Sequence, residues 1–150
     1  RPYRVFGERL GTVLLRVPDA LVRDDAALDR VLRAWPADVP LTFEFQHPSW
    51  DDDWVHQRLG AAGAALCVTD LPTLDEPPLI RLTGPFLYLR LRRDDYGPAD
   101  LEAWAARIEP FRSAGQDVYC FFKHDPVGHA AELAGELLVL LGDRPAPVPG

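Results

Sequence analysis

Five short runs of apolar, β-branched or aromatic residues recur along the 150-residue chain. Most of these runs are continuous rather than alternating, as in "TVLLRV" and "VYCFF". Continuous runs are typical of strands that are covered on both faces, as in a parallel sheet. We therefore predict five parallel strands, at Thr12–Val17, Leu41–Gln46, Ala64–Thr69, Phe86–Leu91 and Val118–Phe122.

Most segments between the runs carry helical patterns. Asp25–Trp35 has apolar residues at three- and four-residue spacing, which indicates one helix. Ser49 followed by Asp52 has the spacing of a capping box that opens a second helix. Pro98 and Pro126 stand where the first residue of two further helices is expected.

The segment Leu71–Pro85 differs from the others because it is rich in proline, and we expect an irregular connection with little or no helix. The ending "RPAPVPG" is typical of a linker or a disordered end. We therefore expect one α/β domain over residues 1–143 and a proline-rich tail over residues 144–150.

Alternating strands and helices predict an α/β fold with right-handed crossovers. A doubly wound sheet of five strands fits the chain length. A closed (β/α)₈ barrel needs about 250 residues, so this chain could supply only part of one. The pattern alone favours the doubly wound sheet.

Composition narrows the class of protein. The chain is 47% hydrophobic and 26% charged, as soluble globular proteins are. Its net charge of -7 argues against broad binding to nucleic acid or to an anionic membrane. No apolar stretch reaches the roughly 18 residues of a membrane helix. Cys67 and Cys120 lie inside apolar runs, so we expect buried, reduced thiols and a cytoplasmic location.

Five sequence blocks together carry a resemblance to a known family. In order they are "FEFQHPSW", "ALCVTD", "FLYLRLRRDDY", "LEAWAARI" and "VYCFFKHD". They resemble the second half of the DUF72 or YecE-like family, whose members show an "EFRHPSW" segment, a strand ending in Asp, a "YLRLRR…Y" strand and a last strand ending in "FKHE" or "FNND". The resemblance implies strands four to eight of a TIM-like barrel, which reverses the choice of architecture.

The resemblance has two departures. Gln46 stands where the family has an arginine, so any anion or carboxylate contact of that arginine would be lost. The family's first three strands have no counterpart, which would leave two open sheet edges. The chain is then either a fragment or a partner for another chain. Because the family has no established activity, the resemblance implies a fold more than a function.

In TIM barrels, the reactive residues lie at the C-terminal ends of the strands. We predict His47, Asp70 and Glu44 as candidate catalytic residues. A reference pKa of about 6.5 suits His47 to acid–base work, with Asp70 orienting it. The structural alternatives are a local hydrogen bond of His47 that holds the turn before Pro48 and a capping or turn role for Asp70.

The expected ligand-binding residues follow the later strands. Glu44 and Arg90 would share one barrel layer, either as an interior ion pair or with Arg90 binding a carboxylate or phosphate. The remaining candidates lie at or beyond the strand ends: Gln46, Tyr96, Lys123 and His124.

The sequence gives less support for a metal site or a nucleotide site than for an anion site. His47, Asp70, His124 and either Glu44 or Asp125 have the side chains of a zinc or manganese site, but no local ligand spacing accompanies them. There is also no glycine-rich phosphate loop after a strand. We therefore predict no metal ligands and leave the cofactor unknown. His56 and His129 lie on expected helices, where we expect them to be exposed.

These observations leave three functional hypotheses. The first is a domain that binds or acts on a small anionic ligand in a polar pocket at the strand ends. The second is a metal-dependent phosphoester hydrolase, which could act on nucleic acid. The third is a non-catalytic barrel fragment that serves as an interaction module and associates with itself through its open sheet edges.

Overall fold

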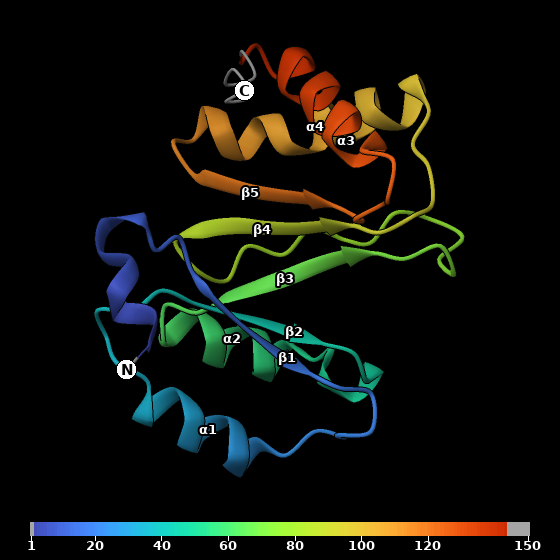
Figure 1. The fold of residues 1–150 in the computed structure, drawn as a ribbon. Coiled ribbons are helices and arrows are strands. Elements are labelled where there is room, and N and C mark those ends of the chain that lie inside the picture. Colours follow the sequence, from blue (N-terminus) through green and yellow to red (C-terminus); the bar gives the residue numbers. More distant parts are fainter. Residues whose placement is uncertain (1, 144–150) are drawn as a thin grey trace. The chain divides into compact units, whose positions relative to one another are not determined.

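The computed structural model describes residues 2–143 and contains one five-strand sheet (Figure 1). Each strand matches an expected run to within one residue at either end. The strands are β1 (Val13–Val17), β2 (Leu41–Phe45), β3 (Ala65–Asp70), β4 (Phe86–Leu91) and β5 (Asp117–Phe122). The expected tail, 144–150, lies outside the described residues.

The order of the strands in the sheet is β1-β2-β3-β4-β5. β1 pairs with β2 in parallel, with Leu15 beside Phe43, and β2 pairs with β3 in parallel. A sequential parallel order is the winding of a (β/α) barrel, whereas a doubly wound sheet reverses its order part-way. The open sheet is therefore consistent with part of a barrel, and the doubly wound alternative is wrong.

The helices lie in the expected segments. They are the α-helices α1 (Asp25–Ala34), α2 (Asp53–Ala61), α3 (Pro98–Ser113) and α4 (His129–Leu140), and the 3₁₀ turns η1 (Pro2–Arg9) and η2 (Pro48–Trp50). Pro98 opens α3 as expected. The connection 71–85 contains no helix, also as expected.

Two expected helix starts are wrong. Ser49 lies inside η2, and Asp52 is the N-cap of α2, where its side chain accepts from the amide of Trp54. The Ser49 hydroxyl instead accepts from the amide of Arg23. Helix α4 begins at His129, three residues after Pro126, because a separate turn precedes it.

Contacts divide the chain into two compact units, and the division falls within β3 and β4. The N-terminal unit comprises Arg1–Val68 and Leu79–Tyr88, and the C-terminal unit comprises Thr69–Pro78 and Leu89–Gly150. In the N-terminal unit, α1 and α2 pack beside β1 and β2 (Figure 1). Their shared core is apolar and centred on Leu28, Leu41, Phe43, Trp50, Val55 and Leu59.

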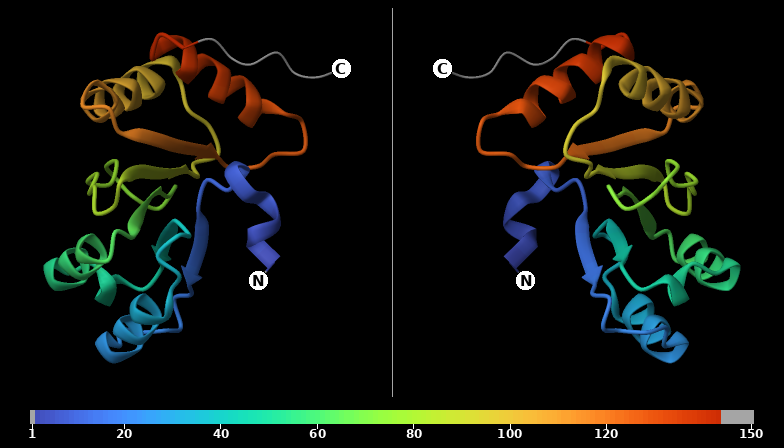
Figure 2. Two further views of the ribbon diagram at one scale, coloured as in Figure 1. Left: turned by 90° about the vertical axis from the view of Figure 1, so that its left-hand side faces the viewer. Right: turned by 90° about the vertical axis from the view of Figure 1, so that its right-hand side faces the viewer.

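In the C-terminal unit, α3 and α4 lie side by side and both contact β5, as two further views show (Figure 2). Leu101, Trp104 and Ile108 of α3 are buried, as are Leu133 and Leu137 of α4. This three- and four-residue spacing turns one face of each helix toward the core. That packing positions the ends of β4 and β5.

Two further expectations concern membranes and thiols. No helix among residues 2–143 is long and apolar enough to cross a membrane. Among residues 2–143, neither Cys67 nor Cys120 forms a disulfide, and Cys67 is buried whereas Cys120 is partly buried. Loss of hydration raises the pKa of the Cys120 thiol to about 12, so this thiol is protonated at neutral pH.

Candidate functional site

A fully buried carboxylate lies at the C-terminal end of β3. Asp70 accepts from Nε of Arg93, at 3.0 and 3.1 Å from its two oxygens, and from the hydroxyl of Tyr96 at 3.0 Å. The Tyr96 hydroxyl in turn accepts from the amide of Arg93 at 3.2 Å. A buried charge is tolerated only with such partners, so the three residues form one structural cluster.

The cluster fixes the direction of the Arg93 guanidinium. The hydrogen bond that Arg93 donates to Asp70 raises the pKa of Arg93, and burial raises the pKa of Tyr96, so Arg93 is charged and Tyr96 is neutral. Nη2 of Arg93 donates to the carbonyl of Leu74 at 3.4 Å. Within the described residues, Nη1 has no hydrogen-bond partner. Arg93 therefore keeps donors available while its position is fixed.

Arg93 lines a cavity of about 200 Å³ at the ends of β4 and β5. Lys123 lines the same cavity and contacts Asp94 at 2.5 Å. His124 lines it too and makes no hydrogen bond to any described residue. The other lining residues are Asp94, Tyr96, Phe122, Asp125, Pro126, His129, Ala130 and Leu133. The cavity therefore combines the cationic groups of Arg93 and Lys123 with aromatic and aliphatic side chains and with the carboxylates of Asp94 and Asp125.

Asp125 has a structural role beside this cavity. Its carboxylate accepts from the amides of Val127, His129 and Ala130, and these hydrogen bonds lower its pKa. The side chain therefore organises the turn that leads into α4, but it is not the N-cap of that helix, which is Gly128. Its charge is largely satisfied by backbone donors.

His129 begins α4 at the same cavity. It contacts Asp95 at 2.9 Å and Glu132 at 3.2 Å, and these contacts raise its pKa. Its side chain is 43% exposed. The expectation that His56 is exposed is wrong, because its side chain is only 11% exposed.

The predicted site residues of the N-terminal unit form a second polar group. The Glu44 carboxylate is buried on β2, with Nε of Arg16 at 3.6 Å. With its amide oxygen turned toward Arg16, Gln46 accepts from Nη2 and Nε of Arg16 at 2.5 and 3.2 Å. Arg16 on β1 thus supplies the guanidinium that holds both side chains.

His47 makes the local hydrogen bonds of a turn. Its Nδ1 accepts from the amide of Ser49 at 3.1 Å and lies 2.8 Å from the Ser49 hydroxyl. Because Nδ1 accepts, neutral His47 carries its proton on Nε2. This arrangement is the structural alternative that the sequence offers for His47. An additional acid–base role of Nε2 stays a prediction.

The predicted residues therefore fall into two groups. The C-terminal unit brings Asp70 and Tyr96 into direct contact and places Lys123 and His124 on the cavity beside Tyr96. Glu44, Gln46 and His47 belong to the N-terminal unit. Arg90 is partly buried on β4, and its expected pairing with Glu44 stays a prediction.

Sequence reasoning did not single out two residues of this cluster. Arg93 appears only within the run "RLRRDDY". If Asp70 is buried, it requires a cationic partner, but three arginines of this run could provide one. His129 was expected to be an exposed helical residue. Among residues 2–143, no three His, Cys, Asp or Glu side chains lie close enough together to hold a metal ion.

A sequential parallel sheet with polar residues at the strand ends defines an α/β protein of the (β/α)-barrel class. The chain belongs to the DUF72 family, because the model of that family, described as "Protein of unknown function DUF72", matches residues 1–149. The resemblance to DUF72 is thus confirmed. No curated protein matches the chain.

Solved DUF72 structures share the fold. A DUF72 family protein from Thermotoga maritima MSB8 is 21% identical with a TM-score of 0.78, over 93% of this chain and 60% of that chain. One from Enterococcus faecalis V583 is 18% identical with a TM-score of 0.77, over 92% of this chain and 63% of that chain. The chain therefore spans less than two thirds of the length of these relatives.

Proposed function

We propose that the C-terminal unit binds a small anion in the cavity at the ends of β4 and β5. The observation that carries this proposal is the guanidinium of Arg93, which is fixed by buried Asp70 while it lines the cavity. A guanidinium held in this way loses little freedom when it binds a carboxylate or a phosphate.

Two neighbours of Arg93 add polar nitrogens to the cavity. His124 has both ring nitrogens available within the described part of the chain. Lys123 is held only by Asp94, whose side chain is 82% exposed, and such a pair is worth about 0–1 kcal/mol. An incoming anion can therefore take over the ammonium group of Lys123 at small cost.

Titration with inorganic phosphate, followed by backbone and arginine side-chain NMR signals, tests the proposal. We expect saturable shifts at Arg93, Lys123 and His124. Lys123→Gln should weaken binding by about tenfold or more, the size expected for a charged hydrogen bond. Arg30→Gln is the matched control, because it makes the same change in net charge on the exposed face of α1.

The Arg30→Gln variant should bind phosphate within about twofold of the wild type, because Arg30 does not line the cavity. Absence of saturable shifts would refute the anion site. Equal weakening by both substitutions would show attraction to net charge rather than a site.

Catalysis remains a separate part of the proposal, with His47 as acid–base and Glu44 of the same unit in a supporting role. A catalytic role of Asp70, which belongs to the other unit, stays a prediction. The support for the role of His47 is its Nε2, which the hydrogen bond at Nδ1 leaves protonated. His47→Asn keeps an acceptor for the Ser49 amide but removes the titratable group. In a screen of small phosphate and carboxylate esters, turnover by the wild type should disappear in this variant. Retained turnover would exclude His47 from the chemistry.

A second candidate function is an interaction module that associates with itself through its sheet edges. Its support is the difference in burial between edge and central strands. Most residues of β2, β3 and β4 are buried, whereas no residue of β1 or β5 is fully buried and Phe121 is 47% exposed. No such observation favours the metal-dependent hydrolase. Two cysteines that form no disulfide in the described part of the chain support our proposal of a cytoplasmic location.

A further inference from the structure

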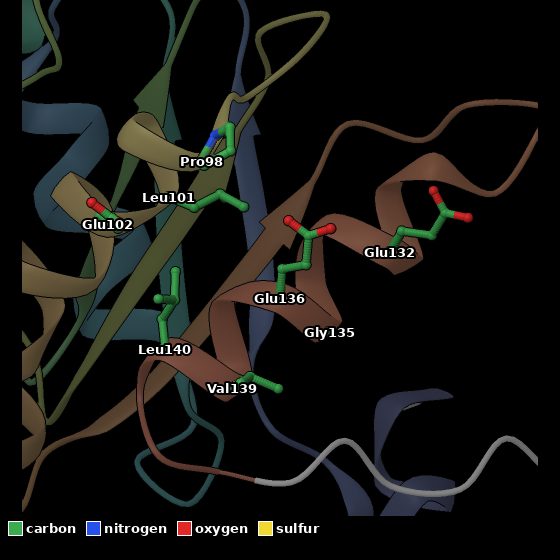
Figure 3. A pocket seen from close by; sticks show the side chains of 8 residues that line it. All are labelled: Pro98, Leu101, Glu102, Glu132, Gly135, Glu136, Val139 and Leu140. Carbon is green, nitrogen blue, oxygen red and sulfur yellow. The ribbon is translucent and has the colours of Figure 1, made fainter.

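A second hollow of the C-terminal unit lies between α3 and α4, away from the strand ends (Figure 3). Its volume is about 570 Å³. Pro98, Leu101 and Glu102 contribute from α3, and α4 contributes Glu132, Gly135, Glu136, Val139 and Leu140. The hollow is therefore a groove between two parallel-packed helices rather than a gap in the sheet.

The floor and one end of the groove are apolar and open to solvent. Val139 is 63% exposed and Leu140 is 47% exposed, and Leu138 beside them is also exposed. Single exposed apolar residues are ordinary, but three in succession beside a groove are typical of an interaction surface.

The rim of the groove is acidic. Glu102, Glu132 and Glu136 all line it, and Figure 3 shows the carboxylates of Glu132 and Glu136 along one side of α4. Glu132 contacts His129, whereas Glu102 and Glu136 have no ion pair with any described residue. An occupant with cationic groups beside its apolar groups would satisfy these carboxylates.

Gly135 keeps the middle of the groove open. It lies in the interior of α4, where glycine is less favourable than almost any other residue. Because Gly135 itself lines the groove, we expect a larger side chain at this position to narrow it.

We propose that this groove docks a basic amphipathic helix from a partner protein, with apolar side chains on the floor and Lys or Arg beside the glutamates. Helix-in-groove recognition of this kind buries apolar anchors at i, i+3, i+4 and i+7. Charge complementarity selects the occupant, because three rim carboxylates attract cationic side chains and would repel an anionic membrane surface.

Fluorescence anisotropy of the full chain tests this proposal with two synthetic helical peptides. One peptide carries leucines at i, i+3, i+4 and i+7 with lysines at the other positions. The other peptide carries glutamates in place of the lysines. We expect the wild type to bind the lysine peptide and not the glutamate peptide.

Two variants locate the binding. Gly135→Leu fills the groove and Glu136→Lys reverses a rim charge, and each should weaken binding at least tenfold. Glu76→Lys is the matched control for charge, since Glu76 is exposed in the connection 71–85, and it should change binding less than twofold. A thermal melt of Gly135→Leu should show an unchanged or higher midpoint, because leucine favours helix.

Several results would overturn the proposal. These are no binding of the lysine peptide up to about 1 mM, equal binding of both peptides, undiminished binding by Gly135→Leu, or equal weakening by Glu76→Lys. Self-association of the chain that Gly135→Leu abolishes would make a second copy the occupant, and the proposed partner would then be wrong.

Discussion

Asp70 is buried where β3 ends, and hydrogen bonds from Arg93 and Tyr96 replace the water that its carboxylate loses. Because a half-satisfied buried carboxylate costs more than an apolar residue, the three side chains depend on one another. The position of the Arg93 guanidinium, on which the proposed anion site depends, is fixed by Asp70.

Asp70→Asn should therefore destabilise the protein strongly. The substitution keeps the shape of the side chain but leaves Arg93 without its counter-charge, and breaking such a pair costs about 3 kcal/mol. Asp94→Asn is the matched control, because the exposed Asp94–Lys123 pair contributes about 0–1 kcal/mol. Chemical denaturation measures both. Similar losses for the two variants would contradict a special role of Asp70.

His129 should make stability depend on pH. Its pKa is raised from 6.5 in the folded protein, first by the hydrogen bond that it donates to Asp95 and then by the one that it donates to Glu132. Both states bind the proton below pH 6.5, so the stabilisation is full there and is lost as pH rises through the raised pKa. Asp95 stays ionised in this window because the same contact lowers its pKa.

Thermal midpoints of the wild type and of His129→Gln, measured across this window, give the check. The difference between the two midpoints should be largest at mildly acidic pH and should shrink as the solution becomes alkaline. Lys123, His124 and Asp125 line the same cavity and are present in both proteins. Their contribution to the pH dependence therefore cancels in the difference between the wild type and His129→Gln. A difference that stays constant with pH would refute the role of His129.

The sequence predicts much of this site but not the pairs within it. Asp70, Tyr96, Lys123 and His124 can be found as polar residues at or beyond strand ends. The pairing of Asp70 with Arg93 cannot be predicted in this way, because Arg93 lies beyond the end of β4 at Leu91. The conformation of the backbone after the strand determines which arginine side chain reaches Asp70. Alternation along a strand predicts side-chain direction only within the strand.

At the scale of elements, the strands are predictable because continuous apolar runs coincide with burial. The first residues of helices are less predictable, as Ser49 and Asp52 show. Both are suitable N-cap residues, but the Ser49 hydroxyl accepts from the amide of Arg23, which lies 26 residues away in the chain. A contact at that separation in the chain cannot be predicted from the local sequence pattern. With Ser49 bonded to Arg23, Asp52 is the residue that caps α2.

The connection 71–85 ends in a close approach that only glycine allows. A Cβ on Gly84 would lie 2.7 Å from the backbone nitrogen of Ala65, at the start of β3. We expect Gly84→Ala to cost about 1–3 kcal/mol, because the backbone of β3 cannot move aside without disturbing the sheet. Denaturant unfolding measures the loss.

Gly97→Ala provides the control for Gly84. The added Cβ would meet only the Asp100 carboxylate, at 3.5 Å, an ordinary contact. Because Gly97 is the N-cap of α3, Gly97→Ala should lower the free energy of unfolding by at most about 1 kcal/mol. Equal costs at the two positions would show that the close approach at Gly84 does not matter.

At the scale of the whole molecule, the order of the strands is the feature that periodicity does not encode. Continuous apolar runs indicate parallel strands but are equally compatible with a sequential and a doubly wound order. The choice of a barrel came from five sequence blocks that resemble DUF72, and the sequential sheet agrees with it. In that order, β1 and β5 are the edges of the sheet.

The self-association that we propose for these edges can be tested through the backbone of β1. The amide of Val13 donates to Pro40 on the side of β2, so by alternation the amide of Leu14 points to the free edge. Leu14→Pro removes that donor, and proline is tolerated on an edge strand when its nitrogen faces outward. We expect the wild type to dimerise with rising concentration in sedimentation equilibrium and Leu14→Pro to stay monomeric.

Leu14→Ala separates the backbone donor from the side chain. This variant trims the side chain but keeps the amide, so it should associate like the wild type if strand pairing carries the contact. A thermal melt of Leu14→Pro must show that the fold survives. A wild type that stays monomeric, or a Leu14→Pro variant that dimerises equally well, would rule out pairing through β1. Loss of association in both variants would assign the contact to the apolar face of β1 instead of its edge.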